Sequence, residues 1–226
     1  MDPLVWWIPG AFAVGSVPFG LIIGKLNGVD IRTRGSGNIG ATNVWRELGW
    51  KAGLPCFILD VAKGLAPTLL AGLSAGLLDV QDGVPPPTHA WLWLCVMVAS
   101  VLGHIFSPWV GFKGGKGVAT GLGALLGLYP VLTIAGAAAL LVWITLTKAT
   151  RYVGLSSSVA AGMLPIVSAA ELWRRGALDE RAVPYLVVTA LLAGLVIYRH
   201  RGNLARTLKG TEPRIGDPRP KAPEGS

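Results

Sequence analysis

The stretch VATGLGALLGLYPVLTIAGAAALLVWITLT, residues 118–147, decides how this chain folds. It contains no charged residue and is about ten residues longer than the roughly 20 that a helix needs to cross a membrane. The stretch is therefore either one very long helix or two shorter helices with a break near Tyr129 and Pro130. The choice sets the side of the membrane on which every later segment lies.

The composition of the whole chain is that of a membrane protein. Of its 226 residues, 52% are hydrophobic and 14% are charged, and the mean hydropathy is +0.54. That is too apolar for an ordinary soluble domain. We expect an all-α, polytopic transmembrane bundle: one integral membrane domain over residues 1–210, and a disordered cytoplasmic tail over 211–226, which is rich in Pro and charge.

Charge decides between the two readings of residues 118–147. Other apolar segments lie at roughly 3–25, 52–78, 89–108, 152–172 and 183–199. With the break, seven spans alternate, and 16 of the 20 Lys and Arg fall on one side, in 25–51, 109–117, 148–151 and from 199 onward. Cytoplasmic loops collect Lys and Arg. The sequence thus favours seven spans, with the amino terminus outside and the carboxyl terminus in the cytoplasm.

The first cytoplasmic loop, residues 32–46, has a composition suited to phosphate. Its glycines let the backbone turn N–H groups inward, and Arg46 adds charge. Short neutral donors lie between them: Ser36, Asn38, Thr42 and Asn43. The alternative is a flexible interfacial loop that leads into a helix N-cap.

The second cytoplasmic loop, GFKGGKG at 111–117, resembles a nucleotide-binding P-loop only in part. It is one residue short, Gly117 replaces the Ser or Thr that binds magnesium, and an apolar span precedes it instead of a strand. A nucleotide-hydrolysing site is therefore disfavoured. Gly114, Gly115, two lysines (Lys113 and Lys116) and a helix start near Val118 still predict an anion site.

Two further pairs of polar residues fall at or inside spans. His200 and Asn203 share a helix face after the last span, although a cluster of cations that stops translocation is the alternative. Asp60 and Lys63 share a face within a span, where we expect a structural pair that orders the loops from beneath. Without a cluster of Cys or carboxylates at ligand spacing, no metal site is expected.

The ordered set of loop motifs resembles a known family, the bacterial acyl-phosphate:glycerol-3-phosphate acyltransferases. The resemblance is carried by GSGNIGATNVWR at 35–46, GHIFSPWVGFKGGKGVAT at 103–120 and HRGNLARTLKGTE at 200–212, with SVPFG at 16–20 and LDVAKG at 59–64 in support. It extends over almost the whole chain up to the tail.

This resemblance implies an enzyme of the bacterial inner membrane with its active site on the cytoplasmic side. It would transfer a fatty acyl group from acyl phosphate to the 1-hydroxyl of glycerol 3-phosphate, giving lysophosphatidic acid and phosphate. The expected partners are these substrates and membrane lipids, with no nucleic acid and no cofactor, and the oligomeric state stays open. The family lacks the His-x4-Asp motif of other glycerophosphate acyltransferases, and none follows any histidine here.

The resemblance also implies roles for individual residues. Glycerol phosphate would bind Ser36, Arg46, Lys116 and His200, of which Ser36, Lys116 and His200 form the catalytic set. Asn203 and Lys113 would lie near the acyl phosphate, and Asn38, Thr42, Asn43, His104, Gly114, Gly115 and Gly117 would complete the substrate site. Asp60, Lys63 and Glu212 would be structural. The general base is left open between a histidine and the donor phosphate; we favour the phosphate, with His200 orienting the acceptor.

A transporter or channel for an organic phosphate is the main competing class, because it would share the spans and the basic loops. Transporters place their sites near the middle of the bilayer, whereas the polar clusters here fall at one face. A membrane scaffold without chemistry would not require three phosphate-suited loops on one side. The sequence therefore favours the enzyme.

Overall fold

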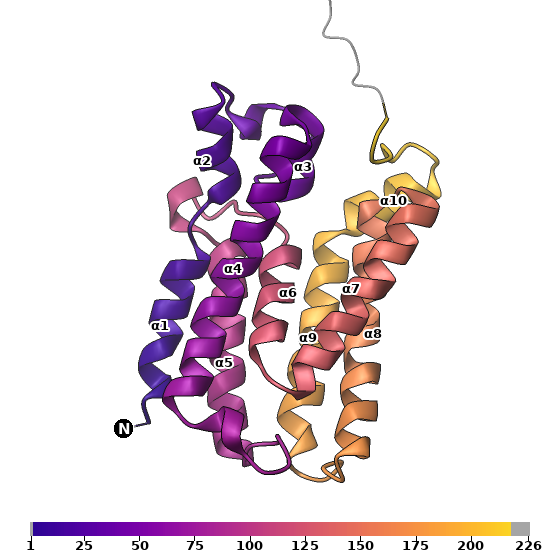
Figure 1. The fold of residues 1–226 in the computed structure, drawn as a ribbon. Coiled ribbons are helices and arrows are strands. Elements are labelled where there is room, and N and C mark those ends of the chain that lie inside the picture. Colours follow the sequence, from indigo (N-terminus) through magenta and orange to yellow (C-terminus); the bar gives the residue numbers. More distant parts are fainter. Residues whose placement is uncertain (1, 218–226) are drawn as a thin grey trace, which may run out of the picture.

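The computed structural model describes residues 2–217 and shows a bundle of helices, without a strand in that range (Figure 1). The α-helices are α1 Leu4–Gly15, α2 Phe19–Leu26, α3 Ala41–Leu48, α4 Trp50–Ser74, α5 Pro87–Ile105, α6 Val118–Gly127, α7 Val131–Thr150, α8 Val153–Arg174, α9 Ala182–Arg199 and α10 Arg201–Leu208. Three short 3-10 helices lie between them: η1 Ile31–Thr33, η2 Leu77–Asp79 and η3 Pro108–Val110. The predicted all-α fold is confirmed.

Within the described residues, six helical segments are long and apolar enough to cross a membrane. Their outer faces expose large apolar side chains such as Trp6, Leu141, Ile166 and Leu191, each more than 60% exposed. Such faces are costly in water but favourable in hydrocarbon. The bundle therefore has the surface of a multi-pass membrane protein.

The predicted break in residues 118–147 is confirmed, because α6 ends at Gly127 and α7 begins at Val131. The ten residues of α6 rise about 15 Å, roughly half of a hydrocarbon core. By length, six helical segments of the described residues can span, the first of them made of α1 and α2, and α6 is too short, so the count of seven stays a prediction. Figure 1 nevertheless shows α6 and α7 running in opposite directions, with the amino terminus and α10 at opposite ends of the bundle.

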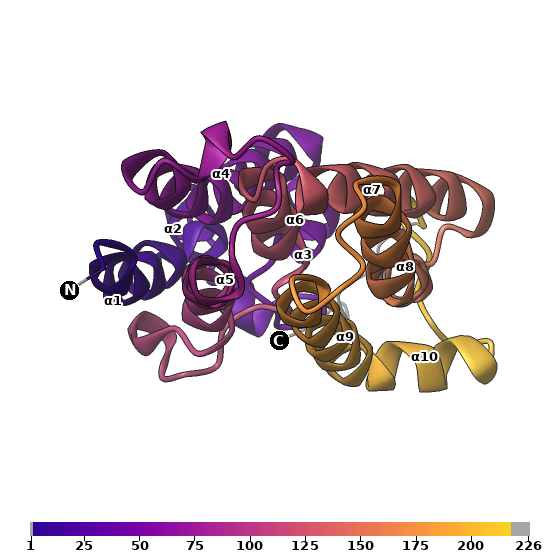
Figure 2. The same cartoon turned by 90° about the horizontal axis from the view of Figure 1, so that it is seen from below.

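The bundle has two parts that meet along two pairs of helices, α6 with α7 and α5 with α9. Helices α1, α4, α5 and α6 pack together on one side, and α7, α8 and α9 on the other (Figure 2). Helices α4 and α6 approach each other closely at two glycines: a Cβ added at Gly64 would overlap the Thr120 carbonyl oxygen, and one added at Gly123 would overlap that of Val61. Small residues allow such close approach between membrane helices. This packing brings the start of α6 beside α4 and α5.

The first predicted span, 3–25, is interrupted. The chain leaves α1 at Ser16 and enters α2 only after Pro18, because proline has no N–H to donate to the preceding turn. Two distant side chains hold the break: Ser107 Oγ donates to the Ser16 carbonyl at 2.6 Å, and Lys63 Nζ donates to the Val17 carbonyl at 2.7 Å. The break is therefore a fixed corner.

The predicted tail begins with an ordered segment. Glu212 is buried, the Ile215 N–H donates to the Arg151 carbonyl at 2.9 Å, and Arg214 stacks over Tyr152. Glu212, Arg214 and Ile215 therefore contact the body, and the domain boundary at 211 stays a prediction. The rest of the predicted tail, 218–226, lies outside the described residues.

Candidate active site

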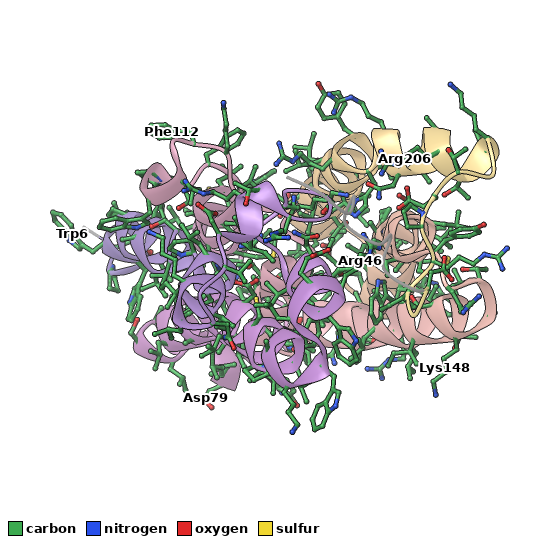
Figure 3. The ribbon with its side chains drawn as sticks, turned by 90° about the horizontal axis from the view of Figure 1, so that it is seen from above. Trp6, Arg46, Asp79, Phe112, Lys148 and Arg206 are labelled. Atoms are coloured by element: carbon green, nitrogen blue, oxygen red, sulfur yellow. The ribbon has the colours of Figure 1, made fainter. Side chains whose placement is uncertain are left out.

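Three loops that are far apart in the sequence meet at one end of the bundle, as the basic-loop pattern predicted. They are residues 34–46, which include the first six residues of α3, residues 111–117 before α6, and the junction of α9 with α10 (Figure 1). Figure 3 looks down on this end and labels Arg46, which belongs to α3, and Arg206 on α10. This end is described below as the cationic end.

Lys116 lies at one end of a hydrogen-bonded chain that runs through Asn203 and Glu212 to Arg206. Its ammonium group donates to the Asn203 side-chain oxygen. Asn203 Nδ2 then donates to Glu212 Oε1 at 2.6 Å, and Arg206 Nε donates to Glu212 Oε2 at 2.7 Å. Because Glu212 is buried while accepting both bonds, it fixes Asn203 and, through it, Lys116.

The surroundings of Lys116 lower its pKa. Burial is the largest cause that lowers the pKa of Lys116 to about 8, and Glu212 opposes it. The positive charges of Arg206, Arg199 and Arg46 lower the pKa as well. Several cations thus gather around one carboxylate, which is an arrangement suited to an anionic ligand.

His200 is held in one neutral form beside this cluster. Burial is the largest cause that lowers its pKa to about 4, followed by the charge of Lys116. His200 Nδ1 lies 2.9 Å from the Val196 carbonyl oxygen, which can only accept, so Nδ1 carries the proton. Nε2 is then the free acceptor at pH 7.

The first loop is shaped by Asn43, whose side chain is buried. Its Oδ1 accepts from the Ser36 N–H at 3.0 Å, and its Nδ2 donates to the Arg34 carbonyl at 3.1 Å. Asn38 Oδ1 accepts from the Gly40 N–H at 2.8 Å, just before α3 begins. Asn43 and Asn38 therefore fold the loop, while Ser36 is exposed and Thr42 lies in the first turn of α3.

The glycine loop folds back onto α5. The Gly114 N–H donates to the Ile105 carbonyl at 3.0 Å, and the Gly115 N–H donates to the His104 carbonyl at 3.2 Å. The expectation that these two N–H groups face an anion is therefore wrong, because the end of α5 uses them. The remaining backbone donors are those of the first turn of α6, which begins after Gly117 and has no intrahelical partners for them.

His104 lies beneath the glycine loop and is almost completely buried. A Cβ added at Gly115 would come within 2.0 Å of His104 Nε2, so only glycine fits there. On the other side of the ring, Nδ1 lies 3.7 Å from Asp60 Oδ1, and Asp60 pairs with Lys63 at 2.7 Å. The buried pair therefore contacts the ring that supports the loop.

Two residues depart from the sequence-based assignment. Lys113 is exposed, and Figure 3 shows its neighbour Phe112 projecting outward, away from Arg46 and Arg206. Lys113 thus lies outside the cluster around Lys116. Arg199, counted in the sequence only as a cytoplasmic cation, donates to the Gly115 carbonyl at 2.8 Å. Its signal in the sequence is its position next to His200, at the end of a span.

Within residues 2–217, no group of three or more His, Cys, Asp or Glu side chains is placed to hold a metal ion. The cationic end instead offers an ammonium group, several guanidinium groups, a neutral imidazole and amide groups. Such a set can hold a phosphate and stabilise negative charge that develops beside it.

The fold and this end define an integral membrane helical protein with a cluster of cationic side chains at one end. Residues 5–210 match the family described as glycerol-3-phosphate acyltransferase. The chain is 43% identical over 205 residues to the protein of that name from Geobacter sulfurreducens, covering 91% of this chain and 94% of the relative. It is 41% identical over 208 residues to that of Trichlorobacter lovleyi, covering 92% and 95%.

A solved structure gives the same result. The crystal structure of PlsY, an integral membrane glycerol 3-phosphate acyltransferase in its glycerol 3-phosphate form, superimposes with a TM-score of 0.77 at 39% identity. The match covers 94% of this chain and 96% of PlsY. A second PlsY structure, in the lysophosphatidic acid form, has a TM-score of 0.75. This chain belongs to the glycerol-3-phosphate acyltransferase family.

Proposed function

We propose that this protein transfers a fatty acyl group from acyl phosphate to the 1-hydroxyl of glycerol 3-phosphate. The products are 1-acylglycerol 3-phosphate and inorganic phosphate. The observation that carries this proposal is the cluster of Lys116, His200 and Asn203, which two distant loops bring together at one end of a membrane bundle. Both substrates carry phosphate and one carries a hydrocarbon chain, so such a site belongs at a membrane surface.

The side chains divide into those that hold the anions and those that shape the loops. Lys116, Arg46 and Ser36 bind the phosphate of the acceptor, and Asn203 lies near the donor. Asn38, Asn43 and Thr42 shape the first loop, while Gly114, Gly115 and Gly117 shape the second. Asp60, Lys63 and Glu212 are structural, and the position of His104 behind Gly115 supports the loop.

The reaction needs position more than a strong base. The 1-hydroxyl attacks the acyl carbon, the bond from that carbon to the phosphate oxygen breaks, and the hydroxyl proton passes to the departing phosphate. Acyl phosphate is already activated, so fixed cations and donors supply most of the stabilisation. His200, with a pKa of about 4, is a weak base at pH 7 but can accept a hydrogen bond from the hydroxyl through Nε2.

The first experiment uses purified protein in detergent or lipid with palmitoyl phosphate and glycerol 3-phosphate. Phosphate release and lysophosphatidate are recorded together, with palmitoyl-CoA as a parallel donor. We expect both products in equal amounts from the acyl phosphate and none from the CoA ester. A folded sample that binds glycerol 3-phosphate but turns over neither donor would exclude the enzyme and favour a transporter.

The same preparation tests the membrane orientation. We propose that the cationic end faces the cytoplasm of a bacterial inner membrane, because most Lys and Arg lie there. A single cysteine placed at Lys209, in a variant whose two native cysteines are replaced, should react with a membrane-impermeant maleimide in inverted vesicles. Labelling only in right-side-out vesicles would reverse the orientation.

A further inference from the structure

The side chain of Arg199 occupies a position between the two loops that supply the substrate ligands. It is the last residue of α9, and the next residue is His200. Its Nη2 donates to the Gly115 carbonyl oxygen at 2.8 Å and lies 3.5 Å from that of Gly114. The residue after Gly115 is Lys116. One guanidinium group therefore connects the end of α9 to the loop that carries Lys116.

The peptide groups of Gly114 and Gly115 are held from two sides. Their N–H groups donate to the carbonyls at the end of α5, and their carbonyls face Arg199 from α9. The ring of His104 closes the space beneath Gly115. If the guanidinium is removed, water molecules can donate to the Gly114 and Gly115 carbonyls, but they do not tie them to α9. Its removal therefore frees the loop on the side of α9.

We propose that Arg199 is a positioning residue: it clamps the glycine loop to α9 and so sets where Lys116 lies relative to His200. This rests on the proposed acyl transfer. The guanidinium donates to backbone carbonyls, so its role differs from that of a cation that binds the substrate phosphate. It also differs from a cation that only contacts lipid headgroups, because its acceptors lie inside the protein.

The clamp explains why arginine stands there and lysine is a poor substitute. Here one nitrogen, Nη2, faces both carbonyls from the end of a rigid planar group, whereas an ammonium is a compact point charge on a flexible stem. Arg199→Lys keeps the charge and loses the planar group, and Arg199→Gln loses both. Arg201→Gln is the matched control, because Arg201 is exposed and stacks on Tyr198 at 4.1 Å, away from the loop.

The test measures steady-state kinetics of the four full-length proteins with palmitoyl phosphate and glycerol 3-phosphate, after each is shown to be folded by thermal melting. We expect Arg199→Gln to lower kcat by about 10- to 100-fold, as small displacements of catalytic groups do. The kcat of Arg199→Lys should lie between that of Arg199→Gln and that of the wild type, and the kcat of Arg201→Gln should equal the wild-type value. The KM for glycerol 3-phosphate should change less than kcat.

A pH profile separates positioning from loss of folded protein. The groups that face Lys116 are Glu212, Arg206, Arg199, Arg46 and His200. Removing the charge of Arg199 should raise the pKa of Lys116 and move the alkaline limb of kcat/KM upward, whereas Arg199→Lys should leave that limb in place.

Several results would overturn the proposal. They are wild-type kcat in Arg199→Gln, equal losses in Arg199→Gln and Arg201→Gln, a KM effect that exceeds the kcat effect, or a loss that only tracks the folded fraction with an unmoved pH profile. If Arg199→Gln does not fold, the kcat of Arg199→Lys is the test. A reduced kcat supports the proposal, and a wild-type kcat contradicts it. No turnover by the wild type would instead refute the acyl transfer itself.

Discussion

At the end of the bundle opposite the cationic end, the three arginines each contact a carboxylate. Arg174 and Arg175 bind the buried Glu171 at 2.7 and 2.6 Å, and Arg181 binds Asp82 at 2.5 Å. At the cationic end, among the described residues, Lys and Arg clearly outnumber Asp and Glu. The same residue types therefore do different things at the two ends.

The difference shows how charge distinguishes a scaffold from a site. Pairing each arginine with a carboxylate ties the α4–α5 connection to the α8–α9 connection and leaves little field for a ligand. At the cationic end, the positive charges of three arginines act on Lys116, and Glu212 is the carboxylate that opposes them. The arginines are Arg46, Arg199 and Arg206. The excess of positive charge costs stability unless an anion binds, so it marks the functional end.

Lys116→Met should cause the largest loss of activity. It tests whether the cationic end is the functional end of the bundle. The Lys116 ammonium group is held by Asn203 and feels the charges of three arginines, so its removal should lower kcat/KM by about 10²- to 10³-fold, as loss of one fixed donor does in other enzymes. Activity with palmitoyl phosphate measures it. Lys148→Met is the control, because Lys148 is exposed on α7 at the same end. Equal losses in both variants would contradict a site centred on Lys116.

His200→Gln should have the next largest effect. If the donor phosphate takes the proton, the variant loses only an orienting contact and kcat should fall by about tenfold. A histidine base would contribute about 10²- to 10⁴-fold, so a loss near the upper limit would establish His200 as the base. Single-turnover measurements on folded protein distinguish the two results.

Glu212→Gln should produce a smaller change that appears mainly in the pH profile. The charge of Glu212 raises the pKa of Lys116, so its removal should lower that pKa below about 8. If charged Lys116 is the active form, kcat/KM is lost as the pH rises through this value, and the alkaline limb should move to lower pH. Asp217→Asn is the control. If the alkaline limb of kcat/KM does not move, the ionisation of Lys116 does not determine that limb.

The sequence predicted the features that follow from composition and charge. The break at Tyr129 and Pro130, the helical bundle and the gathering of the basic loops at one end all appear in the structure. These depend on patterns within one segment, or on the sum of charges in a loop. They are therefore visible without knowing which residues touch.

The sequence did not predict the directions of individual groups in the loops. Glycine adopts many backbone conformations, so nothing in GFKGGKG indicates that Gly114 and Gly115 donate to the end of α5. Likewise, Lys113 and Lys116 look alike in the sequence but differ in exposure. The clamp by Arg199 joins residues 84 apart, and such contacts leave no local pattern.

Arg181→Gln should have the smallest effect and tests the scaffold side of the comparison. Arg181 binds Asp82 and Asp179, and its removal loosens the connection between α8 and α9 at the far end from Lys116. Ion pairs at the protein surface contribute little to stability, so the Tm should fall by no more than a few degrees. The kcat with palmitoyl phosphate at 25 °C should stay at the wild-type value. A loss of activity without a loss of stability would show that the two ends are coupled, because a group about one bundle length away would then affect the site without unfolding it.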